Sequence, residues 1–201
     1  EERPGEHPFL ARLGPDLLTH GVTVEQGMAR LVEPRFRRRG LGGLLLDQAL
    51  FAGIGNYLRS EILFFGGLHH RARPGDLDEA ALERLARSVL EVTRQAYEQA
   101  GVTNRPEWAA ADRARGATRR RWRFAVFERD GLDCHACGRI IERASVASRR
   151  LYACPGCQPP PCTSCQPPPP PEPPPCNGGG NCGPGGGNWN GNINTNVNVN
   201  V

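Results

Sequence analysis

The chain has 201 residues, of which 25 are basic and 21 are acidic, so its formal net charge is +4. Every basic residue is an arginine, which excludes a lysine nucleophile or a Schiff-base lysine, and the modest basic excess favours a polyanionic partner. No apolar run reaches the ~20 residues that a membrane-spanning helix requires, so the sequence predicts no association with a membrane.

The start of the chain carries no targeting signal. Residues 1–10, EERPGEHPFL, lack the cationic start and apolar centre of a signal peptide. They also lack an initiator methionine, and we therefore expect that the chain begins inside a longer protein. Its eight cysteines would suit a secreted protein with a disulfide framework. Because a lost signal peptide would leave no trace, the compartment has to be inferred from the spacing of the cysteines instead.

Helical patterns occupy the next part of the chain. Thr23 to Gln26 have the Ser/Thr-x-x-Glu/Gln pattern of a capping box, which predicts a short helix to about Leu31. The apolar segment LGGLLLDQALFA, residues 41–52, predicts a buried helix. NYLRSEILFF, residues 56–65, predicts a second buried helix after a glycine turn.

A long amphipathic helix and a polar segment follow. Asp78 is placed to cap a helix that runs to about Ala100, because apolar residues recur at three- and four-residue spacing and Gly101 follows. Residues 103–121 are polar and arginine-rich and are expected to form a mobile loop or linker. The alternation at the start of RWRFAVF, residues 121–127, predicts a strand that leads into a cysteine-bearing module.

The glycine turn between the two apolar segments has two interpretations. Gly costs ~1 kcal/mol relative to Ala inside a helix, so Gly53 and Gly55 break the helical pattern. The following helix N-terminus would present unpaired N–H groups to a phosphate, and glycines would let a backbone approach closely. Asn56 would then add a side-chain donor. By pattern alone, an ordinary turn in which Asn56 caps its own helix is the simpler interpretation.

The strongest chemical signal is the pattern Cys134-x2-Cys137-x16-Cys154-x2-Cys157. Two CxxC pairs at this distance are typical of one tetrahedral Zn²⁺ held by four thiolates, with a β-hairpin between them. Four thiolates leave no open coordination position, so the expected role is structural, and a module of about 30 residues depends on the metal to fold. Two disulfides or a redox CxxC are the alternatives.

The segment between the cysteine pairs predicts two strands with a turn near Ala147 and Ser148. This turn places Arg149 and Arg150 at the tip of the hairpin. A guanidinium on a rigid tip is well suited to contact a phosphate. A solvated turn arginine explains the same pattern equally well.

The end of the chain has a different composition. Residues 159–201 are rich in Pro, Gly and Asn and are expected to be a disordered low-complexity tail. Cys162 and Cys165 form a further CxxC pair without a matching partner pair. Cys176 and Cys182 are too far apart in sequence to form a usual pair of zinc ligands. Cys162 and Cys165 could bind a metal, but the pattern does not complete a second site of four cysteines.

Three segments in order resemble one family. They are HPFLARLGPDLL (7–18), RFRRRGLGGLLLDQALFAGIGNYLRSEILFFGGL (35–68) and FAVFERDGLDCHACGRIIERASVASRRLYACPGCQ (124–158). Together they resemble the formamidopyrimidine-DNA glycosylase / endonuclease VIII family, nearest to bacterial endonuclease VIII. The resemblance implies a mainly α fold, in which a helix-two-turns-helix DNA-binding domain (1–115) precedes a four-cysteine zinc β-hairpin finger with its linker (116–158).

The resemblance also implies roles for individual residues. Asn56 would bind the backbone phosphates near a lesion, and Arg12 would be another DNA contact. Arg149 would be the finger arginine, which touches the same phosphates and is given a catalytic role as proton donor in the final elimination. Because the pKa of arginine lies above ~12, we expect its main role to be electrostatic. One structural Zn²⁺ is implied on Cys134, Cys137, Cys154 and Cys157.

The implied partner is double-stranded DNA that contains damaged bases or abasic sites, bound by a monomer at the nucleoid in the bacterial cytoplasm. Enzymes of this family use an N-terminal proline amine, the neighbouring glutamate and a lysine. This chain starts with Glu1 and Glu2, its first proline, Pro4, is internal, and it has no lysine. The chain is therefore interpreted as the DNA-binding part of a bifunctional glycosylase/AP lyase for oxidised bases, with pyrimidines expected. A non-catalytic module for damaged DNA and a general zinc-ribbon interaction protein are the alternatives.

Overall fold

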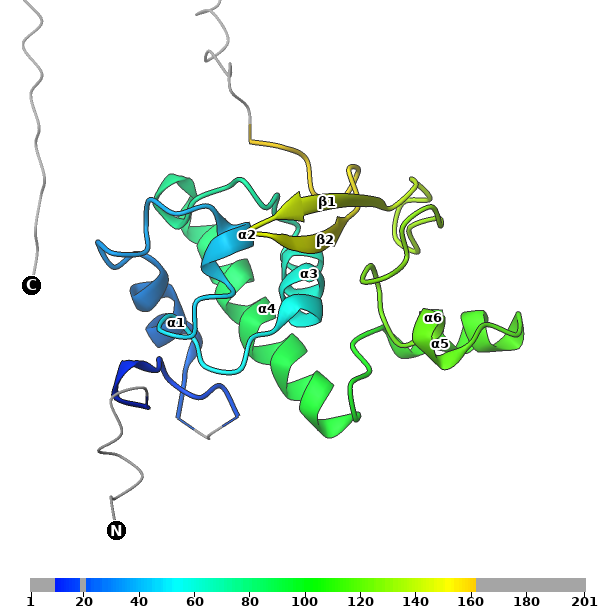
Figure 1. Ribbon diagram of the computed structural model, residues 1–201, viewed down its shortest axis with the longest axis horizontal. Helices are drawn as coiled ribbons and strands as arrows, with labels where there is room; N and C mark the ends of the chain where they lie inside the picture. The colour runs from blue at the N-terminus through cyan, green and yellow to red at the C-terminus, as the bar shows by residue number, and fades with distance from the viewer. Residues whose placement is uncertain (1–9, 19–20, 162–201) are drawn as a thin grey trace, which may run out of the picture. The chain divides into compact units, whose positions relative to one another are not determined.

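The long helix α4 (Glu79–Glu98) lies at the centre of the helical packing in the computed structural model (Figure 1). The structure describes residues 10–18 and 21–161, all within one compact unit. The other elements are η2 (Leu10–Arg12), α1 (Val24–Leu31), α2 (Leu41–Leu44), α3 (Asn56–Phe65), η3 (Pro74–Asp76), α5 (Pro106–Ala114), α6 (Arg119–Trp122), β1 (Glu142–Val146) and β2 (Arg149–Ala153). The predicted tail from residue 162 onward, with its four cysteines, lies outside the described residues.

The predicted helix starts at Thr23 and Asp78 are confirmed. The Thr23 hydroxyl accepts the N–H of Gln26 at 3.3 Å, and the Gln26 side chain accepts the N–H of Thr23 at 3.0 Å, so the capping box is complete. Asp78 accepts the N–H of Ala81 at 2.7 Å and caps α4. Both caps satisfy N–H groups that have no partner within their own helix.

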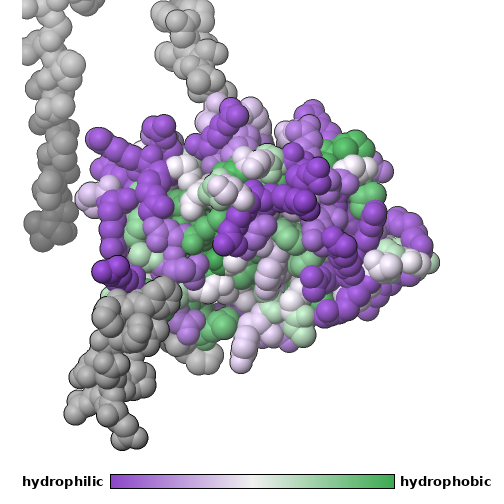
Figure 2. All heavy atoms as spheres, in the orientation of Figure 1, coloured by the Kyte–Doolittle hydropathy of each residue, from purple (hydrophilic) through white to green (hydrophobic). Residues whose placement is uncertain are grey.

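The core forms where α1 and α3 pack against α4. The apolar face of α4 is buried there as its spacing predicts, through Leu82, Leu85, Val89, Val92 and Ala96. Hydrophilic residues cover much of the visible surface, and hydrophobic residues are exposed between them (Figure 2). No helix within the described ranges combines the length and apolar character needed to cross a membrane.

The helix predicted over residues 41–52 is wrong beyond Leu44. Side chains in this segment bind nearby backbone groups and so compete with helical hydrogen bonds. Asp47 accepts the N–H of Ala49 at 2.9 Å, and Gln48 accepts the N–H of Gly53 at 2.9 Å and donates to the carbonyl of Ile54 at 3.1 Å. The result is a series of turns that lead to the glycines.

The predictions for residues 103–127 are also wrong. The expected loop contains helices α5 and α6, and α5 begins with Pro106, a residue that suits the first turn of a helix. The expected strand over 121–127 is absent from the described residues. The N–H groups of Ala125, Val126 and Phe127 all point to one carboxylate, that of Glu61. Three successive N–H groups cannot converge in this way in a strand, where they alternate in direction.

The predicted hairpin is confirmed. Strands β1 and β2 pair antiparallel, with Val146 opposite Arg149, so the turn consists of Ala147 and Ser148. Both turn residues have a positive φ, 53° and 58°, which is the backbone of the tight turns that match strand twist. The hairpin packs on α3, and its tip lies beside α2 (Figure 1). The finger is therefore part of the same packed unit as the helices.

Candidate metal centre and nucleic-acid interface

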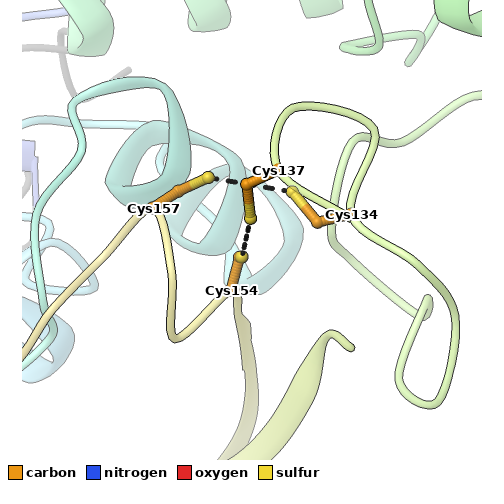
Figure 3. Close-up of side chains that lie close together, drawn as sticks. All are labelled: Cys134, Cys137, Cys154 and Cys157. Atoms are coloured by element: carbon orange, nitrogen blue, oxygen red, sulfur yellow. Dashed lines mark hydrogen bonds between the residues drawn. The ribbon is translucent and has the colours of Figure 1, made fainter. Parts of the chain in front are cut away.

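The four predicted metal ligands meet in space. Cys134 and Cys137 lie on a turn before β1, and Cys154 and Cys157 lie on a turn directly after β2 (Figure 3). Their sulfur atoms all lie within 4.8 Å of one another, with 3.8 Å between Cys134 and Cys157 and 3.3 Å between Cys137 and Cys154. All four are free thiols rather than disulfides, so the structure does not contain the disulfide alternative.

The spacing of these sulfurs fits a tetrahedral ion. Bonds of ~2.3 Å from zinc to sulfur place neighbouring sulfurs ~3.8 Å apart. The N–H of Arg139 and the neighbouring thiols lower the pKa of Cys137 to about 7. Burial raises the pKa of Cys134 and Cys157. A bound cation would offset this cost and hold all four sulfurs as thiolates.

A buried glutamine fastens the second cysteine pair to the helical core. Gln158 accepts the N–H of Cys154 at 2.9 Å and donates to the carbonyl of Leu68 at 3.0 Å. Its side chain is almost fully buried. This role was not predicted from the sequence, although Gln158 directly follows the last ligand.

Replacement of Gln158 with alanine should lower the free energy of unfolding by about 2 kcal/mol, because a buried N–H and a buried carbonyl lose their partners. Thermal unfolding of the zinc-loaded chain measures this loss. Gln99→Ala, at an exposed position after α4, is the control and should change the midpoint little. Equal midpoints for the two variants would contradict the role of Gln158.

The first cysteine pair lies next to side chains of α5. Asp112 is buried and lies 2.7 Å from Arg129, 2.7 Å from Arg115 and 3.2 Å from the His135 ring nitrogen. Burial opposes ionisation of Asp112, but the two guanidinium groups outweigh it and hold its pKa below the usual value. The His135 ring also stacks on Trp108, with 5.2 Å between the ring centroids. This cluster lies against the turn that carries Cys134 and Cys137.

Asn56 is the first residue of α3, and Gly55 is the N-cap. The side chain of Asn56 does not cap the helix, so the capping interpretation is wrong. Its amide donates instead to the carbonyl of Arg150 on the hairpin, at 2.9 Å. The structure thereby brings the glycine turn and the hairpin tip together across 94 positions of the sequence.

The arginines predicted to bind DNA differ in their surroundings. Arg149 is exposed at the start of β2, next to the hairpin turn, and forms no ion pair within the described residues. Arg12 is exposed at the end of η2. Its segment is joined to the turns before Asn56, because Gly14 donates to the carbonyl of Gln48 at 2.8 Å. No contact in the described part of the chain joins Arg12 to Asn56 or Arg149.

Two buried charged residues on α3 were not predicted from the sequence. Arg59 and Glu61 are both 0% exposed. Arg59 donates to groups of α2, Asn56 and the hairpin, whereas Glu61 accepts hydrogen bonds from the segment that leads into the finger. The only available signal was the presence of two charged residues inside the apolar pattern NYLRSEILFF.

The fold and the site define a class of protein in which a helical module and a four-cysteine β-hairpin form one packed unit. Residues 13–106 match the family described as "Formamidopyrimidine-DNA glycosylase H2TH domain". The chain belongs to the formamidopyrimidine-DNA glycosylase / endonuclease VIII family. The resemblance inferred from the sequence motifs is therefore confirmed.

Individual relatives agree with this assignment. Endonuclease 8 of Klebsiella pneumoniae is 44% identical over 157 residues, which are 78% of this chain and 56% of that protein. The crystal structure of the MutM (Fpg) protein from Thermus thermophilus is 36% identical with a TM-score of 0.61, over 76% of this chain and 56% of that one. A mutant Lactococcus lactis Fpg in complex with a Fapy-dG containing DNA is 25% identical with a TM-score of 0.59, over 75% and 53%. The chain spans about half the length of the relatives it matches.

Proposed function

We propose that this chain is the DNA-binding part of a bifunctional DNA glycosylase/AP lyase that removes oxidised bases, pyrimidines above all, in base-excision repair. The observation that carries the proposal is the junction of the α3 N-terminus with the hairpin tip, made by Asn56 and the Arg150 carbonyl. The partner would be double-stranded DNA with a damaged base or an abasic site, bound by a monomer at the bacterial nucleoid. A relative named Endonuclease 8 and the solved complex of an Fpg mutant with a Fapy-dG containing DNA support the assignment.

The glycine turn has the properties that a phosphate site requires. A Cβ added at Gly53 or Gly55 would meet nothing within 4 Å, so a DNA backbone has room to approach. The first N–H groups of α3 receive no side-chain cap and would face a phosphate at the positive end of the helix dipole. The Asn56 amide carries two N–H bonds, and within the described residues only the Arg150 carbonyl accepts one of them.

The finger would supply the second contact. Zn²⁺ on Cys134, Cys137, Cys154 and Cys157 would provide the charge that holds four thiolates together and keeps the hairpin rigid. Arg149 at the tip would stabilise a phosphate next to the lesion, including the negative charge that develops during elimination. The chain contains no lysine, so a lysine that takes part in the reaction would lie outside it, and Arg149 is the residue of this chain that we assign to the reaction.

DNA binding by variants tests the proposal. Fluorescence anisotropy with a duplex that contains a tetrahydrofuran abasic-site analogue should show weaker binding for Asn56→Ala and Arg149→Ala. For Arg149→Ala, and for Arg12→Ala, the slope of log K against log salt should also fall by about one, because one phosphate contact is lost. Asn56→Ala removes a neutral donor and should leave the slope nearly unchanged.

Arg94→Ala is the matched control, because it removes the same charge from an exposed position on α4. Its affinity should stay close to that of the unchanged chain. If Arg94→Ala and Arg149→Ala weakened binding equally, or if the folded chain did not bind the duplex, the proposed interface would be wrong.

A further inference from the structure

Arg59 is a buried arginine that no acidic group of the described residues neutralises. It lies on α3 with 0% of its surface exposed, and within the described residues no carboxylate contacts its guanidinium. Burial, together with the charge of Arg149, lowers its pKa to about 10, so the group stays charged at neutral pH. A buried charge without a counter-charge is costly, and an apolar side chain of similar size is often more favourable. Stability alone therefore gives a poor explanation for an arginine at this position.

The guanidinium joins three parts of the molecule that are distant in sequence. Its Nη1 donates to the carbonyl of Gly42 in α2 at 2.8 Å and to that of Val146 at 3.1 Å. Its Nη2 donates to the carbonyl of Arg150 at 3.1 Å. Val146 directly precedes the two-residue turn and Arg150 is the second residue after it, so the planar fork of Arg59 binds both strands next to the tip and fastens them to the helices.

The same group determines how the Asn56 side chain is oriented. Arg59 Nη2 donates to Oδ1 of Asn56 at 2.7 Å. If the amide were flipped, its NH₂ group would face a guanidinium that can only donate. The Asn56 NH₂ group is thus directed to the Arg150 carbonyl.

We propose that Arg59 is a positioning residue that fixes the Asn56 amide and the Arg149 tip relative to each other, so that both contact one DNA backbone as a preformed surface. The inference rests on the proposed function, since it assigns Arg59 to the same interface. Pre-arrangement would remove the cost of ordering the hairpin when DNA binds. A carboxylate next to Arg59 would lower the free-energy cost of burying its charge. It would also reduce the positive potential at the surface that would bind the phosphates.

The test is the substitution Arg59→Lys in the full zinc-loaded chain, with binding to the tetrahydrofuran duplex as the readout. Lysine keeps the charge, but its ammonium group cannot reach acceptors on α2, Asn56 and the hairpin together. We expect the affinity at fixed salt to fall about tenfold, as for the loss of charged hydrogen bonds. In a chain that already carries Asn56→Ala, the same substitution should lower the affinity for the duplex at most about threefold, because the Asn56 amide is no longer present to be positioned.

A purely structural role predicts a different pattern. The control is Ser88→Ala, which removes a buried hydrogen bond from α4 to the carbonyl of Ile62 and does not contact Asn56 or the hairpin tip. This variant should lower the unfolding midpoint without changing the affinity of the folded protein. If Arg59→Lys folds and binds like the unchanged chain while Asn56→Ala weakens binding, the positioning role is wrong and the proposed function stands. If neither substitution changes binding, the proposed function itself is wrong.

A second measurement leaves Arg59 in place, in case its substitution prevents folding. In Asn56→Ala, hydrogen exchange of residues 146–150 should become several-fold faster, because the tip loses the Asn56 contact and Arg59 loses an acceptor that orients it. Exchange in α4 is the internal reference and should stay unchanged. Unchanged exchange at the tip in a folded Asn56→Ala chain would overturn the inference.

Discussion

Removal of zinc with a chelator is expected to unfold residues 124–158 and to leave the packing of α1, α3 and α4 largely in place. The apolar cluster of the finger is small and includes two of the metal ligands themselves, Cys134 and Cys154. Structural zinc sites contribute on the order of 10 kcal/mol to the folding of comparable fingers, which exceeds what such a cluster can supply. The core around α4 is formed mainly by helices and retains most of its buried side chains without the finger.

Hydrogen exchange with and without the chelator shows whether the finger unfolds while the helical core stays folded. Amides of β1 and β2 should lose their protection, amides of α4 should keep theirs, and circular dichroism should show a partial loss of signal. Addition of Zn²⁺ should restore protection, whereas Ca²⁺ should not, because thiolates prefer the softer ion. An unchanged circular dichroism spectrum and unchanged exchange in the hairpin after metal removal would contradict the structural role of the site.

Local sequence patterns predicted those parts of the fold that depend on neighbouring residues. Thr23 and Asp78 cap helices through residues three positions away, and spacing alone identified the two cysteine pairs. The helix over 41–52 failed because Asp47 and Gln48 bind nearby backbone groups. The apolar pattern of this segment does not reveal that competition.

Contacts between distant residues explain the remaining errors. The strand expected at 121–127 is replaced by the end of α6 and by turns. A carboxylate 65 positions from Val126 binds the backbone in these turns. Likewise, the pattern around Asn56 located a helix start but could not show that its amide would bind a carbonyl 94 positions away. In the sequence Arg59 and Glu61 interrupt an apolar helix pattern, whereas in the structure both form hydrogen bonds that join α3 to the finger.

Glu61 has the largest predicted single-residue effect on stability. One carboxylate oxygen accepts the N–H groups of Val126 and Phe127, both at 2.8 Å, and the other accepts the N–H of Ala125 at 2.8 Å and the hydroxyl of Thr103 at 2.7 Å. Each buried donor left without an acceptor costs about 1–3 kcal/mol. Glu61→Ala should therefore lower the free energy of unfolding by about 4 kcal/mol or more.

The isosteric variant Glu61→Gln separates hydrogen bonding from volume. Glutamine fills the same space, but its NH₂ group would face donors that need an acceptor, so we expect a loss of at least about 2 kcal/mol. Urea unfolding of the zinc-loaded chain provides the measurement, with Glu98→Ala on the exposed end of α4 as the charge-matched control. If Glu61→Gln were as stable as the unchanged chain, the carboxylate would not be the group that holds residues 125–127. Asn56, Arg59 and Gln158 would then provide hydrogen bonds that attach the finger to the helices.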